Sequence, residues 1–200
     1  MGTRAYVLAS VSRLEEPVPI KVEMTAHPDQ TDPFYSAPGY PDTGRPGKKN
    51  IIRNPGFEET SLPGWPDYYI SWLGNHTTTE SPFEGRQCMN VMSGHGVRQA
   101  CSPKLDKPTD YVLSAYMRAS KEGMKAKFDG GGWLVPKETF GYKEFTLTKK
   151  WQRYSEKGKL PTGLPTWHSI GVRVPGGQAG TVFIDALQFE KGQEPTEYEP

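Results

Sequence analysis

The chain lacks any long hydrophobic run. None of its apolar stretches approaches the roughly 18 to 20 residues that a helix needs to span a bilayer. Its first residues, MGTRAYVLAS, also lack the apolar core of a secretory signal peptide. Because residues 4–25 already have the pattern of strands, we expect the chain to be a fragment of a longer protein whose signal lay upstream.

Neither sign of charge dominates the sequence. Lys and Arg number 24 against 23 Asp and Glu, which gives a formal net charge of +1, and no run of basic residues stands out. Binding to nucleic acid depends on a concentrated basic surface that releases counterions. We therefore expect no nucleic-acid partner, and the missing apolar runs predict no membrane partner.

Motifs for catalysis are also scarce. The four histidines are scattered, with no H-E-x-x-H or G-x-S-x-G around them, and DGGG (residues 129–132) lacks the Lys and Ser/Thr of a phosphate-binding loop. Acidic residues are numerous enough that two of them could meet in the fold as a glycosidase pair. Small β-sandwich domains with the pattern of this chain generally bind ligands rather than catalyse reactions, so we expect a protein without enzyme activity.

Only two cysteines occur, Cys88 and Cys101, on either side of SGHG (residues 93–96). Gly94 and His95 fit the two-residue loop of a hairpin, because glycine tolerates the positive φ that a type II′ turn requires. In that register Cys88 lies directly opposite Cys101, within disulfide reach. The sequence predicts a disulfide, with two small buried thiols as the alternative; an oxidised pair would indicate an extracellular or periplasmic protein.

What the chain does contain is abundant turn formers and aromatics. The sequence has 22 Gly, 19 Pro and 12% aromatic residues, which is typical of short strands separated by turns. Short apolar runs bounded by turn residues occur at 87–92, 97–101, 111–119, 143–147, 151–157, 168–174 and 181–189. Seven or eight strands at this spacing predict an all-β sandwich of two antiparallel sheets.

A period of two separates the faces of these strands. In residues 167–174 it places Ile170, Val172 and Val174 in the core and leaves Trp167 and Arg173 outside. In residues 111–119 the same rule buries Tyr111, Leu113, Ala115 and Met117 and turns Ser114, Tyr116 and Arg118 the other way.

The sequence divides into three parts. Residues 1–26 predict strands that either end a preceding domain or pack on the main one, since Ile20, Val22 and Met24 alternate with polar residues. Residues 27–49 are rich in Pro, Gly and Asp and predict a linker or an extended strap. Residues 50–200 form the predicted sandwich.

Three segments of this third part, in order and spacing, carry a family resemblance. They are NIIRNPGFEE (residues 50–59) with Trp65 close behind, YVLSAYMRAS (residues 111–120), and TVFIDALQFEKGQEPTEYEP (residues 181–200). Together they resemble the family 4/9-type carbohydrate-binding modules over residues 50–200. The resemblance implies a jelly-roll β-sandwich of the galactose-binding-like group, usually appended to a secreted bacterial glycoside hydrolase.

The resemblance also implies a structural Ca²⁺ that ties the opening segment to the closing strand. The matching positions are Glu58 and Asp185 by side chain and Gly56 by carbonyl, with residues 81–84 supplying further carbonyls. Hard cations take several oxygen ligands, and two neighbouring carboxylates repel each other unless they are neutralised. The alternative is that Glu58 faces solvent and Asp185 caps a turn.

Sugar binding would require exposed aromatic rings beside polar groups, because pyranose rings present apolar faces edged by hydroxyls. The resemblance assigns Trp65 and Trp151 to packing. The other three tryptophans are candidates for stacking on sugar rings; the alternative is that they fold back onto the sandwich as loop aromatics. Polar candidates that could share one sheet face with them complete the predicted site. The full set is Trp72, Trp133, Trp167, Arg98, Tyr116 and Arg173.

These inferences predict a noncatalytic carbohydrate-binding module that holds an attached secreted glycoside hydrolase on polysaccharide. Two alternatives stay open. One is a structural or protein-interaction sandwich that has lost the cleft, and the other is an adhesin or phage-type surface module.

Overall fold

The computed structural model describes residues 48–71, 75–130, 143–164 and 168–200. These residues contain ten strands and no helix. Described turns or bends separate β3 from β4, β5 from β6 and β7 from β8, with glycine in the first two of these connections. The strands are β1 (Tyr69–Ser71), β2 (His76–Thr78), β3 (Cys88–Met92), β4 (Gly96–Ala100), β5 (Thr109–Ala119), β6 (Lys125–Asp129), β7 (Glu144–Thr146), β8 (Gln152–Leu160), β9 (Ser169–Arg173) and β10 (Thr181–Lys191).

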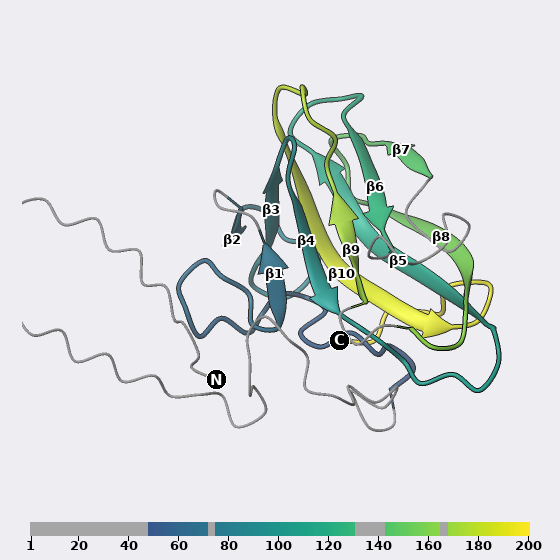
Figure 1. Cartoon of the computed structure of the whole chain (residues 1–200). Coiled ribbons are helices and arrows are strands. Elements are labelled where there is room, and N and C mark those ends of the chain that lie inside the picture. Colours follow the sequence, from purple (N-terminus) through teal and green to yellow (C-terminus); the bar gives the residue numbers. More distant parts are fainter. Residues whose placement is uncertain (1–47, 72–74, 131–142, 165–167) are drawn as a thin grey trace, which may run out of the picture.

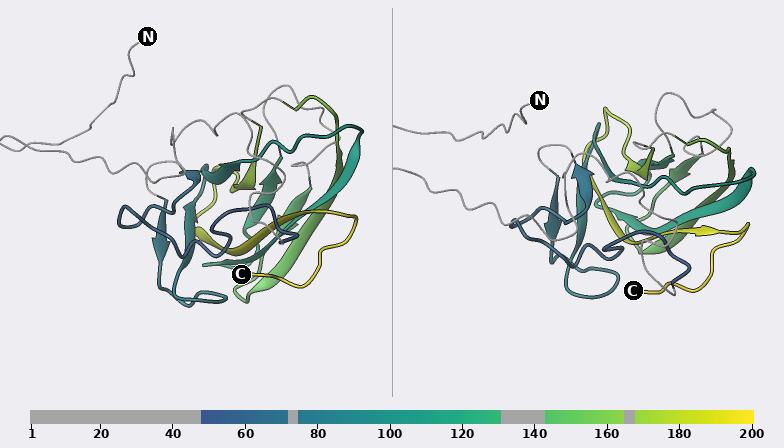
Figure 2. Two further views of the ribbon diagram at one scale, coloured as in Figure 1. Left: turned by 90° about the horizontal axis from the view of Figure 1, so that it is seen from below. Right: turned by 60° about the horizontal axis from the view of Figure 1, so that its bottom comes forward.

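The strands form two five-stranded antiparallel sheets. Sheet I has the order β1-β4-β9-β6-β7, and sheet II has the order β2-β3-β10-β5-β8. The sheets lie face to face (Figures 1 and 2). This arrangement confirms the predicted all-β sandwich of two antiparallel sheets.

The core lies between the sheets and follows the predicted alternation. Ile170, Val172 and Val174 are fully buried, whereas Arg173 between them is exposed. On β5 the predicted inward set is also completely buried, namely Tyr111, Leu113, Ala115 and Met117. All seven predicted strands are present, and β1, β2 and β6 are additional.

The two segments that open and close the resemblance lie side by side, although almost the whole sandwich separates them in sequence. Asn50 is fully buried; its amide nitrogen donates to the Leu187 carbonyl (3.1 Å) and its amide oxygen accepts from the Phe189 N–H (3.0 Å). Ile51 and Leu187 add main-chain hydrogen bonds in this region, to Phe189 and Pro55 respectively. The buried asparagine therefore joins the start of the described domain to β10.

The predicted hairpin around Gly94 and His95 is wrong. β3 and β4 belong to different sheets, so the chain crosses the sandwich between Met92 and Gly96. Gly94 does have a positive φ of 84°, but its N–H donates to the carbonyl of Val174 at the end of β9. The turn is therefore hydrogen-bonded to the end of a third strand. Gly94 has the positive φ that was predicted, although β3 and β4 do not pair as a hairpin.

The predicted disulfide fails with the hairpin. Cys88 begins β3 in sheet II and Cys101 follows β4 in sheet I; both are buried, and both are present as thiols. The open alternative of two small buried thiols therefore holds. Burial raises the pKa of the Cys88 thiol to about 12, so this cysteine is unreactive at neutral pH.

Residues 1–47, which include the predicted terminal strands and nearly all of the predicted strap, lie outside the described residues. The part of the chain that is described holds no helix with the length and hydropathy required to cross a membrane.

Candidate functional site

The outer face of sheet I carries charged side chains contributed by four adjacent strands. On β6, Ala126 and Phe128 point into the core, so Lys125, Lys127 and Asp129 point outward. Arg98 on β4 and Arg173 on β9 face the same side, because they alternate with buried neighbours. We call these five residues and Glu144 of β7 the charged face.

An ion pair spans the middle of the charged face. Gly171 pairs with Arg98 on one side and with Asp129 on the other. Because Gly171 has no side chain, the two flanking groups meet over it, with Arg98 Nη1 3.8 Å from Asp129 Oδ2. The side chains of Arg98 and Asp129 are 29% and 19% exposed, so solvent and a ligand can reach a guanidinium and a carboxylate held together. Such a pair can donate to and accept from sugar hydroxyls.

Two of the predicted binding residues, Arg98 and Arg173, thus lie on one face, but Tyr116 does not join them. Tyr116 belongs to β5 of sheet II and points to the opposite outer surface of the sandwich. Its ring stacks on that of Phe83, with centroids 3.5 Å apart. The alternation correctly turned Tyr116 away from the core, but it carried no information about which sheet contains the strand.

The predicted stacking residues Trp72, Trp133 and Trp167 lie outside the described residues. Trp65 and Trp151, which the resemblance assigns to packing, are only partly buried. Trp151 lies beside the Phe83 and Tyr116 pair, and its Nε1–H donates to the Ser81 carbonyl (2.9 Å). It therefore packs a loop onto sheet II rather than filling the space between the sheets.

A buried histidine lies close to the charged face. His168 is fully buried; its Nδ1 contacts the Cys101 carbonyl and its Nε2 lies 3.3 Å from the Gly130 carbonyl. Burial lowers its pKa, so the neutral ring predominates at neutral pH. His168 connects the ends of β4 and β6 at the start of β9. We assign it to structure rather than to binding.

The resemblance to the family predicted a second region, at the carboxylates Glu58 and Asp185. Asp185 is fully buried, at the point where the register between β5 and β10 shifts. Its Oδ2 accepts from the N–H groups of Phe83 (2.9 Å) and Glu84 (3.2 Å), and its Oδ1 accepts from the N–H of Ala186 (2.7 Å). Burial raises the pKa of Asp185 to about 7, an effect that the nearby Glu84 carboxylate reinforces.

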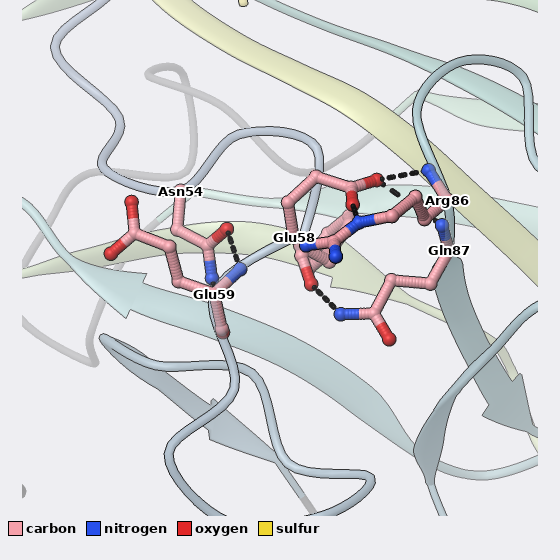
Figure 3. A network of polar contacts seen from close by, with 6 residues as sticks. Asn54, Glu58, Glu59, Arg86 and Gln87 are labelled. Carbon is pink, nitrogen blue, oxygen red and sulfur yellow. Dashed lines mark hydrogen bonds and ion pairs between the residues drawn. The ribbon is translucent and has the colours of Figure 1, made fainter.

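Glu58 holds the other end of the same loop (Figure 3). Its Oε1 accepts from the N–H groups of Arg86 (2.8 Å) and Gln87 (3.1 Å), and Arg86 Nε lies 3.3 Å from its Oε2. Gly85 has a positive φ of 63°, and a Cβ there would overlap the Glu58 carboxylate. The alternative in which Glu58 merely faces solvent is therefore wrong, because its carboxylate fixes residues 85–87.

The motif before Glu58 is folded by its own asparagine. Asn54 has a positive φ of 50°, and its side chain exchanges hydrogen bonds with both main-chain groups of Glu59 (each 2.9 Å). This closed turn leaves Glu58 directed toward the loop of residues 81–87.

Oxygen atoms of the kind that calcium binds lie in this region, although those of Glu58 and Asp185 already accept from N–H groups. The Gly56 main chain lies against Glu84 and Tyr198, since a Cβ at Gly56 would be 3.2 Å from Glu84 Oε1 and 3.4 Å from the Tyr198 hydroxyl. Carboxylates and carbonyls are the hard oxygen ligands that calcium prefers. Among the described residues no three His, Cys, Asp or Glu side chains converge on one point. The ligand set that the resemblance implies, Glu58 and Asp185 by side chain and Gly56 by carbonyl, has two carboxylates and would need further main-chain carbonyls.

Comparisons with known proteins support the class of protein that this fold and face suggest, a β-sandwich that binds carbohydrate. The sequence profile of the carbohydrate binding domain family matches residues 49–176. The chain therefore belongs to this carbohydrate binding domain family. A search of curated protein sequences finds no match.

Solved structures similar to this chain are distant in sequence. A putative sugar binding protein from Bacteroides thetaiotaomicron is 12% identical, covers 72% of this chain and 100% of its own, and has a TM-score of 0.54. The CBM22-1 xylan-binding domain from Paenibacillus barcinonensis is 12% identical (70% and 93% covered, TM-score 0.47). A cyclase from Fischerella is 18% identical (72% and 98% covered, TM-score 0.49). At 12% identity, the likeness to the Bacteroides thetaiotaomicron protein shows a shared fold alone.

Proposed function

We propose that this domain binds polysaccharide on the outer face of sheet I and does not cleave it. The observation that carries the proposal is the partly exposed pair of Arg98 and Asp129, which faces outward in a member of a carbohydrate-binding family. A guanidinium and a carboxylate held side by side offer donors and acceptors to sugar hydroxyls. Trp72, Trp133 and Trp167 remain our candidates for stacking on the sugar rings.

Affinity electrophoresis against soluble xylans, glucans and galactans tests this proposal. We expect Trp167→Ala and Trp133→Ala each to weaken binding about tenfold to hundredfold, because a large apolar side chain in contact contributes about 1 to 3 kcal/mol. Trp151→Phe is the matched control, since Trp151 lies on the surface of sheet II and its replacement should leave retardation unchanged. If the wild type binds a glycan and both alanine variants bind it equally well, the stacking rings lie elsewhere. If no glycan retards the wild type, the structural spacer becomes the better interpretation.

The proposed role is to hold a secreted bacterial glycoside hydrolase on its substrate. Membership of the family supports this role only by analogy, and the thiol state of Cys88 and Cys101 removes the disulfide as an argument for an oxidising compartment. Tethering would raise the effective concentration of polysaccharide at the enzyme without any bond being made.

We also propose that the domain binds a structural calcium ion through Glu58, Asp185 and the Gly56 carbonyl. Among the described residues, main-chain amides donate to the buried Asp185 carboxylate and Glu84 lies nearby, so a cation would favour the ionised form. Chelation with EDTA should then lower the Tm, because a ligand that binds only the native state stabilises it. The Asp185→Asn variant should lose most of this response. An identical Tm with and without EDTA would rule the calcium site out.

A further inference from the structure

Two cations of the charged face lie directly opposite each other. Lys127 on β6 and Arg173 on β9 are paired in register, and both point outward. Directly opposed residues of an antiparallel pair have Cβ atoms about 4.5 to 5.5 Å apart, and like charges there destabilise the sheet. Within the described residues, neither side chain forms a hydrogen bond or an ion pair.

The other charges of this face are already used. Arg98 is paired with Asp129 at 3.8 Å, and Lys125 with Glu144 at 3.7 Å. Glu144 is also the cross-strand neighbour of Lys127 in the β6–β7 pair, but its Oε1 forms the ion pair with Lys125. Lys127 and Arg173 are therefore the two positive charges that the described carboxylates of the face leave uncompensated.

The local imbalance contrasts with the chain as a whole. The charged face has four cations and two carboxylates, whereas the 200-residue chain has a formal net charge of only +1. An uncompensated pair of opposed cations costs stability, so its presence on the proposed binding face suggests that a ligand supplies the missing negative charge.

We propose that the ligand is an acidic polysaccharide, and that Lys127 and Arg173 together bind its anionic group, a uronate carboxylate or a sulfate ester. The inference rests on the proposed function and names the class of its ligand. Arg presents two parallel N–H donors to a carboxylate or sulfate, and Lys adds a compact positive charge from the neighbouring strand. The adjacent Arg98 and Asp129 pair then contacts hydroxyls of the same sugar or of its neighbour.

A polysaccharide suits this face better than a nucleic acid. Nucleic acids present a phosphate at every nucleotide and are bound by extended basic surfaces, and one uncompensated pair beside two carboxylates does not provide one. A polysaccharide with one acid group per sugar needs only one such pair among groups that bind hydroxyls.

The test uses the whole chain in affinity electrophoresis with matched acidic and neutral polysaccharides. Polygalacturonate is compared with its fully methyl-esterified form, and carrageenan with neutral galactan, over a range of salt concentrations. We expect retardation by an acidic member and little by its neutral counterpart, with affinity falling as salt rises. Retardation by polygalacturonate alone assigns a uronate, and retardation by carrageenan alone assigns a sulfate ester; either result supports the proposal.

Charge-removing variants locate the site. Lys127→Gln and Arg173→Gln should each weaken binding of the acidic polysaccharide about tenfold, as expected for a charge-assisted hydrogen bond. Lys157→Gln removes one exposed positive charge from sheet II and should bind like the wild type. Equal effects of all three variants would overturn the assignment, because net charge rather than this pair would then control binding.

The remaining outcomes separate this inference from the function on which it rests. Binding to neutral polysaccharides that is unchanged in Lys127→Gln and Arg173→Gln would overturn the inference and keep the proposed function. A wild-type protein retarded by no polysaccharide would overturn both. Tighter retention by duplex DNA than by any polysaccharide would show that the ligand is a nucleic acid and that the assignment is wrong.

Discussion

The Asp185→Ala variant should lose about 3 kcal/mol of its free energy of unfolding. Three main-chain N–H groups donate to this one carboxylate, from Phe83, Glu84 and Ala186. Leaving a buried donor unsatisfied costs about 1 to 3 kcal/mol, and water can reach the two donors in the partly exposed loop more easily than the one on β10. The total therefore falls at the lower end of the range of about 3 to 9 kcal/mol for three donors.

Ala186 explains why the loss should extend beyond the loop. It has a positive φ of 51°, which costs energy for a residue with a Cβ, and the bond from its N–H to Asp185 Oδ1 holds it there. The register between β10 and β5 shifts at this point, and Leu187 then donates to Pro55. Without the carboxylate, the opening segment and the two longest strands of sheet II lose a common anchor.

Urea denaturation in the presence of EDTA measures this loss apart from any contribution of calcium. Asp185→Asn is the matched control, because it keeps the shape and one acceptor oxygen, and it should lose roughly half as much stability. A midpoint for Asp185→Ala that matches the wild type would mean that the three amides find equally good partners in water.

The faces of the strands could be predicted from the sequence, whereas their partners could not. Ile170, Val172 and Val174 alternate with polar or small residues, and this period of two alone determines that they share a face. The same reasoning placed Tyr116 outside correctly. It could not assign Tyr116 to sheet II, because the order of strands depends on long-range packing that the local pattern does not contain.

The turn at Gly94 shows the same limit. A glycine with positive φ fits a hairpin, but it equally fits a chain that crosses from one sheet to the other. The Gly94 N–H is bonded to Val174, about 80 residues away in sequence, so no local signal could distinguish the two. The predicted disulfide depended entirely on the hairpin register and was lost with it.

Two of the six residues of the charged face could be predicted from the sequence. Arg98 and Arg173 were predicted as binding residues. In β6, Ala126 and Phe128 alternate with charged residues, but two apolar residues between lysines were too weak a pattern for us to predict a strand. The pairing of Arg98 with Asp129 was out of reach, because it requires β4, β9 and β6 to be adjacent.

Gly171→Ala is the second substitution for which we expect a large effect, and it tests the centre of the charged face. A Cβ at Gly171 would overlap the Val97 carbonyl and approach the Arg98 Cα, and both are main-chain atoms that cannot rotate away. The β4–β9 pair would have to separate, in the middle of sheet I and above the fully buried Val97 and Val172. Overpacking of this kind costs about 1 to 3 kcal/mol, and rigid main-chain neighbours place this position at the upper end.

The same substitution should weaken binding in protein that remains folded, because Arg98 and Asp129 meet over the space that the new methyl group would occupy. Thermal unfolding and affinity electrophoresis on the same samples measure the two effects. Ser169→Ala, two residues earlier on β9, is the control: it adds no atoms, so both its Tm and its retardation should stay close to those of the wild type. If Gly171→Ala is as stable as Ser169→Ala, then β4 and β9 have room for a side chain here, and the close approach of these strands does not position the Arg98 and Asp129 pair.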